Sequence, residues 1–209
     1  MTYTIIAVDL EAKSIGIATA TAIPCVGAVV PHVKINVGAI ATQAYTNVWY
    51  GIRGIRMLEL GLKPKTIIQA LTSEDELKNY RQVAIINITG EKAAYTGDRA
   101  PEFKGEIIGE NYIAIGNLLV GRRVLDEMAS AFETANGDLA EKLLKALIAG
   151  DEAGGDRRGK CSAALLIAGP KYLEKTDLPL ISIRVDYDNE PVKKLVKVYE
   201  EFKRTRMRI

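Results

Sequence analysis

The feature that most constrains this chain is its opening, two apolar segments of strand length joined by a short turn. Residues 2–9 read TYTIIAVD, residues 10–13 form the turn, and residues 14–22 read SIGIATATA. Runs of β-branched and small apolar residues bounded by a turn are typical of neighbouring β-strands. The sequence therefore predicts a strand–turn–strand unit in which Thr2 opens a buried strand.

The rest of the chain alternates between strand-like and helix-like blocks. Apolar runs predict strands at 3–9, 14–21, 26–30, 36–42, 81–88, 92–98, 111–117, 163–169 and 180–187. Helical spacing predicts one helix pair within 46–73, a second pair at 120–134 and 138–149, and a terminal helix that opens at Pro191. This order suits an α+β domain over residues 1–209, with two sheets facing each other and helices outside each.

Composition excludes several classes of protein. The chain has 209 residues, 48% of them hydrophobic, and a formal net charge of +2, which gives no reason to expect a nucleic-acid or membrane partner. No apolar stretch reaches the length of about 18 residues that a membrane span needs, and no signal segment opens the chain, so we expect a cytoplasmic protein. One histidine and two distant cysteines, Cys25 and Cys161, argue against a metal site, and we expect no cofactor.

Thr2 is the residue whose position most suggests chemistry. Methionine is commonly trimmed before a small residue, and Thr2 would then become the amino terminus. Its amine could act as the base for its own hydroxyl. The alternative is that Thr2 is simply a good strand residue.

Several phrases of the chain resemble a known family. They are TYTIIAVD, VGAVVPHVK (26–34), GAIATQA (38–44), YGIRGIRMLELG (50–61), YRQVAI (80–85), GNLLVG (116–121) and GGDRRGKCSAAL (154–165). The chain is identified by them as a member of the domain-of-unknown-function family number 1028, which is placed in the Ntn-hydrolase-like superfamily. The resemblance, with a more distant one to proteasome β-type subunits, implies a four-layer αββα sandwich with its site at the mouth between the sheets.

The resemblance also implies roles for particular residues. Thr2 stands where the nucleophile would be, Lys34 where a lysine would lower its proton affinity, and Asn117 with Gly116 where oxyanion donors would lie. Asp156, in the glycine-rich loop, would orient the free amine. The sequence departs from the family pattern in two places, with Ala22 where a basic residue is expected and Cys161 where glutamine is usual.

Other polar residues leave alternatives open. Thr42, Gln43 and Asn47 form a patch that would face a substrate, or that would finish the sheet and cap the next helix. His32 is expected to be a hydrogen-bonded turn residue rather than a base. The loop AGGDRRGKCS (153–162) superficially resembles a phosphate cradle, but it lacks the P-loop pattern and runs from helix to strand, so we expect a structured turn.

Two functional hypotheses follow. The first is a cofactor-free hydrolase of a small amide or peptide-like bond, which acts on a small-molecule or peptide-like ligand through Thr2 after Met1 is removed. The second is a non-catalytic binding or structural protein that uses the same scaffold and keeps Met1. The apolar stripe of the terminal helix is either core or a subunit contact, and a homo-oligomer is expected.

Overall fold

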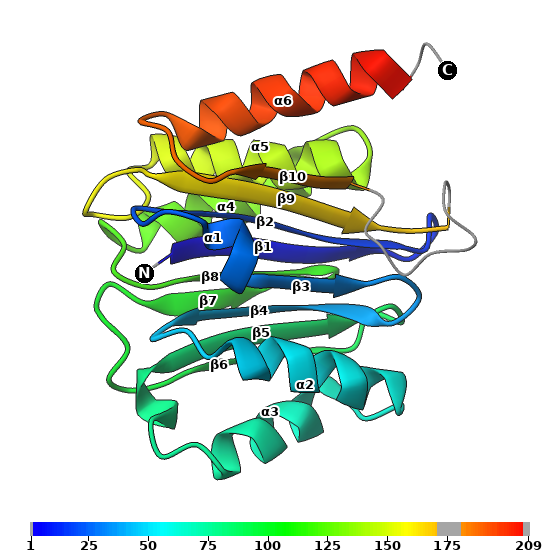
Figure 1. Cartoon of the computed structure of the whole chain (residues 1–209), viewed down its shortest axis with the longest axis vertical. Coiled ribbons are helices and arrows are strands. Elements are labelled where there is room, and N and C mark those ends of the chain that lie inside the picture. Colours follow the sequence, from blue (N-terminus) through cyan, green and yellow to red (C-terminus); the bar gives the residue numbers. More distant parts are fainter. Residues whose placement is uncertain (1, 171–180, 207–209) are drawn as a thin grey trace.

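A computed structural model describes residues 2–170 and 181–206 of the chain. In chain order the elements are β1 (Thr2–Asp9), β2 (Ser14–Thr21), α1 (Val26–Val29), β3 (Pro31–Lys34), β4 (Gly38–Ala44), α2 (Val48–Glu59), α3 (Pro64–Ser73), the 3₁₀ turn η1 (Lys78–Tyr80), β5 (Arg81–Asn87), β6 (Lys92–Thr96), β7 (Gly105–Ile108), β8 (Tyr112–Gly116), α4 (Arg123–Thr134), α5 (Leu139–Glu152), β9 (Ser162–Ala168), β10 (Ile181–Val185) and α6 (Pro191–Arg206). Figure 1 labels them along the ribbon.

The strands form two antiparallel sheets. One has six strands in the order β10-β9-β2-β1-β8-β7, and the other has four in the order β3-β4-β5-β6. The predicted strand–turn–strand unit is confirmed, because β1 and β2 pair over their whole length, with Thr2 opposite Thr21 and Asp9 opposite Ser14. On its other side β1 pairs with β8, so the first strand of the chain lies inside the larger sheet.

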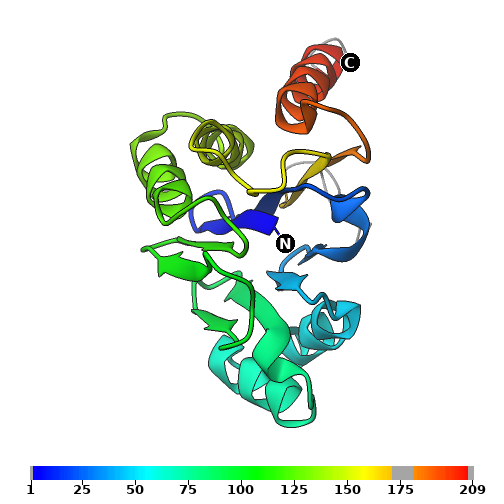
Figure 2. The ribbon, with the colours of Figure 1, turned by 90° about the vertical axis from the view of Figure 1, so that its left-hand side faces the viewer.

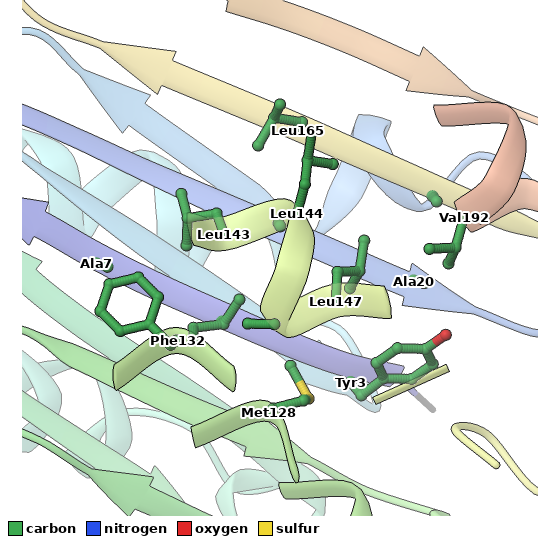
Figure 3. Packing of buried hydrophobic residues seen from close by; sticks show 14 of the residues in the cluster. Tyr3, Ala7, Ala20, Met128, Phe132, Leu143, Leu144, Leu147, Leu165 and Val192 are labelled. Atoms are coloured by element: carbon green, nitrogen blue, oxygen red, sulfur yellow. The ribbon is translucent and has the colours of Figure 1, made fainter. Parts of the chain in front are cut away.

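Three hydrophobic clusters hold the elements together. The first fills the space between the six-stranded sheet and the helices α4, α5 and α6, where Leu147 is fully buried (Figure 3). The second lies between the two sheets and includes Ile6 and Ile86. The third packs α2 and α3 on the four-stranded sheet around Ile67. The expected mixed α and β fold with antiparallel sheets is confirmed, and the described residues form six α-helices (Figure 1).

Three details of the predicted elements are wrong: α1 was predicted as a strand, and the strands β3 and β7 were not predicted. Residues 26–30 are not a strand, because Val26–Val29 form the short helix α1. Gly27 lets α1 pack closely on β9, since a Cβ there would lie 2.8 Å from the Cβ of Ala164. A short apolar run cannot be assigned to strand or helix from periodicity alone. The strand β7 was missed, because residues 99–110 show no apolar alternation. Of the expected strand 180–187, residue 180 lies outside the described residues.

The terminal helix α6 begins at Pro191, as predicted. Its stripe is part of the core, since Val192, Leu195 and Tyr199 are buried in the first cluster. Within residues 2–170 and 181–206, no helix is both long enough and apolar enough to cross a bilayer.

Candidate functional site

The space between the two sheets is apolar along most of its length and polar at one end. Side chains alternate along a strand, so Thr2 and Thr4 share the inner face of β1 with Ile6 and Val8. Neighbouring strands add further polar side chains to the same end. We call the resulting set, each member no more than 2% exposed, the polar cluster: Thr2, Thr4, Thr19, Thr21, Gln43, Gln82 and Asn117. It lies at the end of the sheets marked N in Figure 1, which Figure 2 turns toward the viewer.

Gln82 is the centre of the hydrogen bonds in the polar cluster. Its Nε2 donates to the carbonyl oxygens of Gly116 at 2.9 Å and Gly105 at 3.1 Å. Carbonyl oxygens can only accept, so these two contacts fix which end of the amide is nitrogen. The Oε1 atom then faces the opposite way and accepts from Gln43 Nε2 at 2.7 Å and from Asn117 Nδ2 at 2.9 Å. The orientations of all three amides follow from this arrangement.

Gln43 connects the two sheets. Its Nε2 also donates to the carbonyl oxygen of Thr2 at 3.2 Å, and its Oε1 accepts from Thr4 Oγ1 at 2.7 Å. The Thr4 hydroxyl lies 2.7 Å from the Thr19 hydroxyl. Because Thr4 has one hydroxyl proton and gives it to Gln43, Thr19 is the donor of this last bond. A directed chain of hydrogen bonds therefore fixes the first strand at its Thr2 end.

Asn117 lies directly opposite Thr2 in the larger sheet. The Thr2 amide donates to the Asn117 carbonyl at 3.3 Å, and the Asn117 amide donates to the Thr2 carbonyl at 3.0 Å. In the side chain, Nδ2 donates to Gln82, but Oδ1 has no hydrogen-bond partner. Among the residues that the structure describes, Oδ1 is the only buried side-chain nitrogen or oxygen in this condition. Buried polar atoms are nearly always hydrogen-bonded, so Oδ1 is an unusual acceptor that is available to a further donor.

The Thr2 hydroxyl sits between two polar neighbours. Its Oγ1 lies 3.4 Å from Thr21 Oγ1, on the strand that pairs with β1 on one side. Asn117 is the directly opposite residue on the other side, and such pairs have Cβ atoms about 5 Å apart. A nucleophile at Thr2 would thus have a hydroxyl on one flank and an amide on the other.

The backbone turns sharply just after two of these amides. Ala44, after Gln43, has φ 70°, and Leu118, after Asn117, has φ 52°. Residues other than glycine adopt this left-handed region at a cost of about 1 kcal/mol or more, and they are enriched at functional sites. Both turns occur at the polar end of the sheets, where they direct the chain away once the amide has been placed.

Asp156 lies at the same end of the sheets as Thr2, and its carboxylate is bonded to other groups. Its Oδ2 accepts from the amide of Ala22 at 3.1 Å and from Arg158 Nη2 at 2.6 Å. Ala22 directly follows Thr21, the partner of Thr2 in the β-ladder. Asp156 therefore fixes the end of β2 beside Thr2, and its charge is balanced by the Arg158 guanidinium.

The glycine-rich loop packs against the outer face of β1. Tyr3 donates its hydroxyl to Asp151 at 2.9 Å, and Lys160 donates to the same carboxylate at 2.8 Å. Burial first, and then the charge of Asp151, raise the pKa of Tyr3 well above its usual value, so Tyr3 stays protonated. Gly155 has φ 52°, and a Cβ there would lie 2.8 Å from the Tyr3 ring. These contacts favour the structured-turn interpretation of residues 153–162 over a phosphate cradle.

Lys34 is not brought to Thr2. It pairs with Gly38 at the start of β4, whereas Gln43, which contacts Thr2, lies near the end of that strand. Its Nζ forms an ion pair with Glu59 of α2 at 2.5 Å. Together with His32 it borders a groove of about 440 Å³ between β3 and α2. Burial lowers the pKa of His32, whose Nδ1 lies 3.3 Å from the Val30 carbonyl oxygen.

Thr42 and Asn47 serve the connection from β4 to α2. Thr42 lies on the opposite face of β4 from Gln43, and its hydroxyl donates to the carbonyl of Asn47 at 3.1 Å. Asn47 is the N-cap of α2, where its side chain accepts from the amide of Trp49. Of the two alternatives left open by the sequence, these residues fit capping, while Gln43 fits the inner face. Gly116 contributes its carbonyl to Gln82, as described above.

An ion pair lies behind the polar cluster, on the helix side of the smaller sheet. Arg81 Nε donates to Asp75 Oδ2 at 2.9 Å, and the Asp75 side chain is 12% exposed. Burial alone would raise the pKa of Asp75, but hydrogen bonds from Arg81, the Leu77 amide and the Tyr50 hydroxyl lower it to about 2. The pair fixes the first residue of β5, next to Gln82.

Sequence reasoning missed Gln82 and three threonines, Thr4, Thr19 and Thr21. The threonines carried a signal, because Thr2 and Thr4 on one strand and Thr19 and Thr21 on the next continue the alternation of the buried isoleucines. Gln82 had no such signal, since one glutamine at the start of an apolar strand is usually a solvated residue.

Comparisons with known proteins agree on one family. The model of the family of unknown function DUF1028 matches residues 2–195. The crystal structure of protein SPO2555 from Silicibacter pomeroyi, also described as DUF1028, is similar with a TM-score of 0.87 and 33% sequence identity, covering 96% of this chain and 88% of the other. No curated protein matches at a significant level.

Proposed function

Because the chain belongs to the DUF1028 family, whose function is unknown, we propose its activity from the site itself: it is an amino-terminal nucleophile hydrolase that cleaves a small amide or peptide-like bond at Thr2. We further propose that its layers, two facing sheets with helices outside each, are those of the Ntn-hydrolase-like superfamily. The ligand is a small molecule or a peptide-like chain, and the reaction uses no cofactor.

The position of Thr2 is the main support for this proposal. The first residue after Met1 starts an interior strand, and its side chain enters a buried polar cluster that holds an unsatisfied amide oxygen. A strand of the core needs no such cluster, because burying a polar group costs free energy unless it is hydrogen-bonded, and one oxygen of this cluster has no partner among the described residues. Removal of Met1 would place a free amine and a hydroxyl on the same residue at this position.

The proposed reaction begins with the free amine of Thr2 as base. It takes the Oγ1 proton as Oγ1 bonds to the carbonyl carbon of the substrate, and the carbonyl oxygen becomes an oxyanion. The carbon–nitrogen bond then breaks, and the proton passes from the Thr2 ammonium to the leaving nitrogen. Water hydrolyses the resulting ester in the same manner, which releases the acid and returns the proton to Oγ1.

The surrounding residues have supporting parts in this proposal. Asn117 Nδ2 has two protons, of which one is given to Gln82, and the second is offered to the oxyanion. Gln43 holds the Thr2 carbonyl, and Asp156 holds the neighbouring end of β2 through Ala22. Lys34 has no part, because it lies at the other end of the sheet.

The test uses the natural chain without an amino-terminal tag. Its intact mass reports whether Met1 is removed, and release of amine from a pool of peptide amides and N-acyl amines reports hydrolysis. Thr2→Ala is the matched control, since methionine is also trimmed before alanine, so that this variant keeps the free amine and loses only the hydroxyl. We expect that Met1 is removed, that the wild type and Thr2→Ser release amine, and that Thr2→Ala releases none.

The second candidate is a non-catalytic scaffold that keeps Met1. It is favoured by the burial of Thr2, which is 2% exposed and whose main-chain nitrogen is bonded within the sheet. Retained Met1, together with equal amine release by wild type and Thr2→Ala, would select this candidate.

A further inference from the structure

The side-chain oxygen of Asn117, Oδ1, is buried and has no hydrogen-bond partner among the described residues. The neighbouring hydrogen bonds determine which atom of this amide is the oxygen, so the open atom is an acceptor. The carbonyls of Gly105 and Gly116 orient Gln82, whose Oε1 must then receive protons. Asn117 therefore presents Nδ2 to Gln82, and Oδ1 is the atom left open.

A group beside Asn117 that can gain protons is the main-chain nitrogen of Thr2. In the intact chain it has one proton, which it donates to the Asn117 carbonyl at 3.3 Å. After Met1 is removed the same nitrogen carries up to three protons. One keeps the existing bond, and another becomes available to the side chain of the same asparagine, which lies on the inner face directly opposite Thr2.

We propose that Asn117 Oδ1 is the acceptor that binds and positions the α-ammonium of Thr2. This inference rests on the proposed function for the existence of that ammonium. It assigns the two ends of one amide to two tasks, since Nδ2 faces Gln82 and the oxyanion while Oδ1 holds the base. The buried oxygen left unsatisfied in the chain with Met1 thus gains its partner when the terminus is formed.

A measurable consequence is the pKa of the Thr2 amine. An acceptor stabilises the charged amine, so Asn117 should hold the pKa of the Thr2 amine above the value that this amine has without the acceptor, whereas burial lowers the pKa. The other titratable groups around this end are Asp156 paired with Arg158, Asp151 paired with Lys160 and hydrogen-bonded to Tyr3, Cys161, and the exposed Arg157, whose amide donates to the Leu118 carbonyl. The facing sheet contributes the uncharged amides of Gln43 and Gln82.

The test uses the full chain beginning at Thr2, produced by cleaving a ubiquitin fusion so that it does not depend on natural processing. Isotope-labelled threonine allows the Thr2 amine to be titrated by NMR, with the signal assigned by its absence in Thr2→Ser. Asn117→Ala removes the acceptor, and Asn117→Asp keeps an acceptor and adds a negative charge. Ile17→Val is the matched control, because Ile17 is buried on the inner face of the neighbouring strand β2 but lies outside the polar cluster.

The expected result is a pKa lower by about one unit in Asn117→Ala, equal or higher in Asn117→Asp, and unchanged in Ile17→Val. A pKa that is unchanged in Asn117→Ala, or that falls in both Asn117 variants, overturns the proposal. Because the amine is titrated without any substrate, this outcome is separate from a failure to find hydrolysis or natural loss of Met1.

Discussion

The two ends of the space between the sheets are equally buried but chemically opposite. On β1 alone, Thr4 and Ile6 are both 0% exposed and point to the same face, one into the polar cluster and the other into the apolar cluster between the sheets. The apolar end stabilises the fold by removing surface from water. The polar end needs a complete set of hydrogen bonds to avoid a penalty, and one atom in it is left without a partner. The proposed function accounts for this difference, because a reactive site needs polar groups that the stability of the fold does not require.

The largest effect is expected at the centre of the polar cluster. Gln82→Leu would leave the Gln43 and Asn117 side-chain amides and the Gly116 carbonyl without their partner. We expect the free energy of unfolding to fall by about 4 kcal/mol, measured by urea denaturation. Ile86→Val, on the same face of the same strand, is the control and should cost about 1 kcal/mol. Equal losses in the two variants would contradict the difference drawn between the two ends.

The next largest loss of stability is expected at the apolar end of the space between the sheets. Ile15 is fully buried between the sheets, and Ile15→Ala should lower the free energy of unfolding by about 3 kcal/mol through the cavity it leaves. In the folded fraction, the pKa of the Thr2 amine should stay at its wild-type value, because no polar contact changes. A shifted amine pKa in Ile15→Ala would mean that the two ends are not independent.

The contribution to stability should depend on pH for the ion pair Asp75–Arg81 but not for the uncharged polar cluster. The pKa of Asp75 is lowered to about 2, so the pair stabilises the fold above the unfolded pKa of about 4 and this contribution is lost as the pH falls toward 2. Asp75→Asn should therefore cost about 2 kcal/mol at neutral pH and progressively less below pH 4. The cost of Gln82→Leu should remain constant over that range, because Gln82 and its partners do not titrate. Parallel urea titrations across pH test this, and a cost for Asp75→Asn that does not fall in acid would contradict it.

The smallest losses of stability are expected when one hydroxyl group or one methylene group is removed. Thr4→Val removes the donor to Gln43 Oε1, and Ile17→Val trims a buried isoleucine on the neighbouring strand. Each should cost about 1 kcal/mol. Only Thr4→Val should slow acylation of Thr2 by a β-lactone in the chain that begins at Thr2, because Gln43 also holds the Thr2 carbonyl. Equal acylation rates in both variants would show that the cluster does not position Thr2.

The sequence allowed much of the framework to be predicted, and less of the site. The opening hairpin, the helix pairs and the terminal helix follow from apolar periodicity, which depends on local residues. Helix α1 could not be predicted in this way, because its Gly27 packs against Ala164 of β9, which is more than 100 residues away in the chain. In the site, Asn117 and Gln43 were selected and do contact the Thr2 backbone. Gln82 and the placement of Lys34 depend on which strands become neighbours, which no single segment specifies.

Mapping the adduct that forms when the chain beginning at Thr2 reacts with a β-lactone shows directly whether Thr2 is reactive. We expect one adduct per chain, located on Thr2 by tandem mass spectrometry, and none on Thr2→Ala. An unmodified Thr2, or equal labelling of wild type and Thr2→Ala at another residue, would contradict the claim that the polar end of the inter-sheet space is a reactive site.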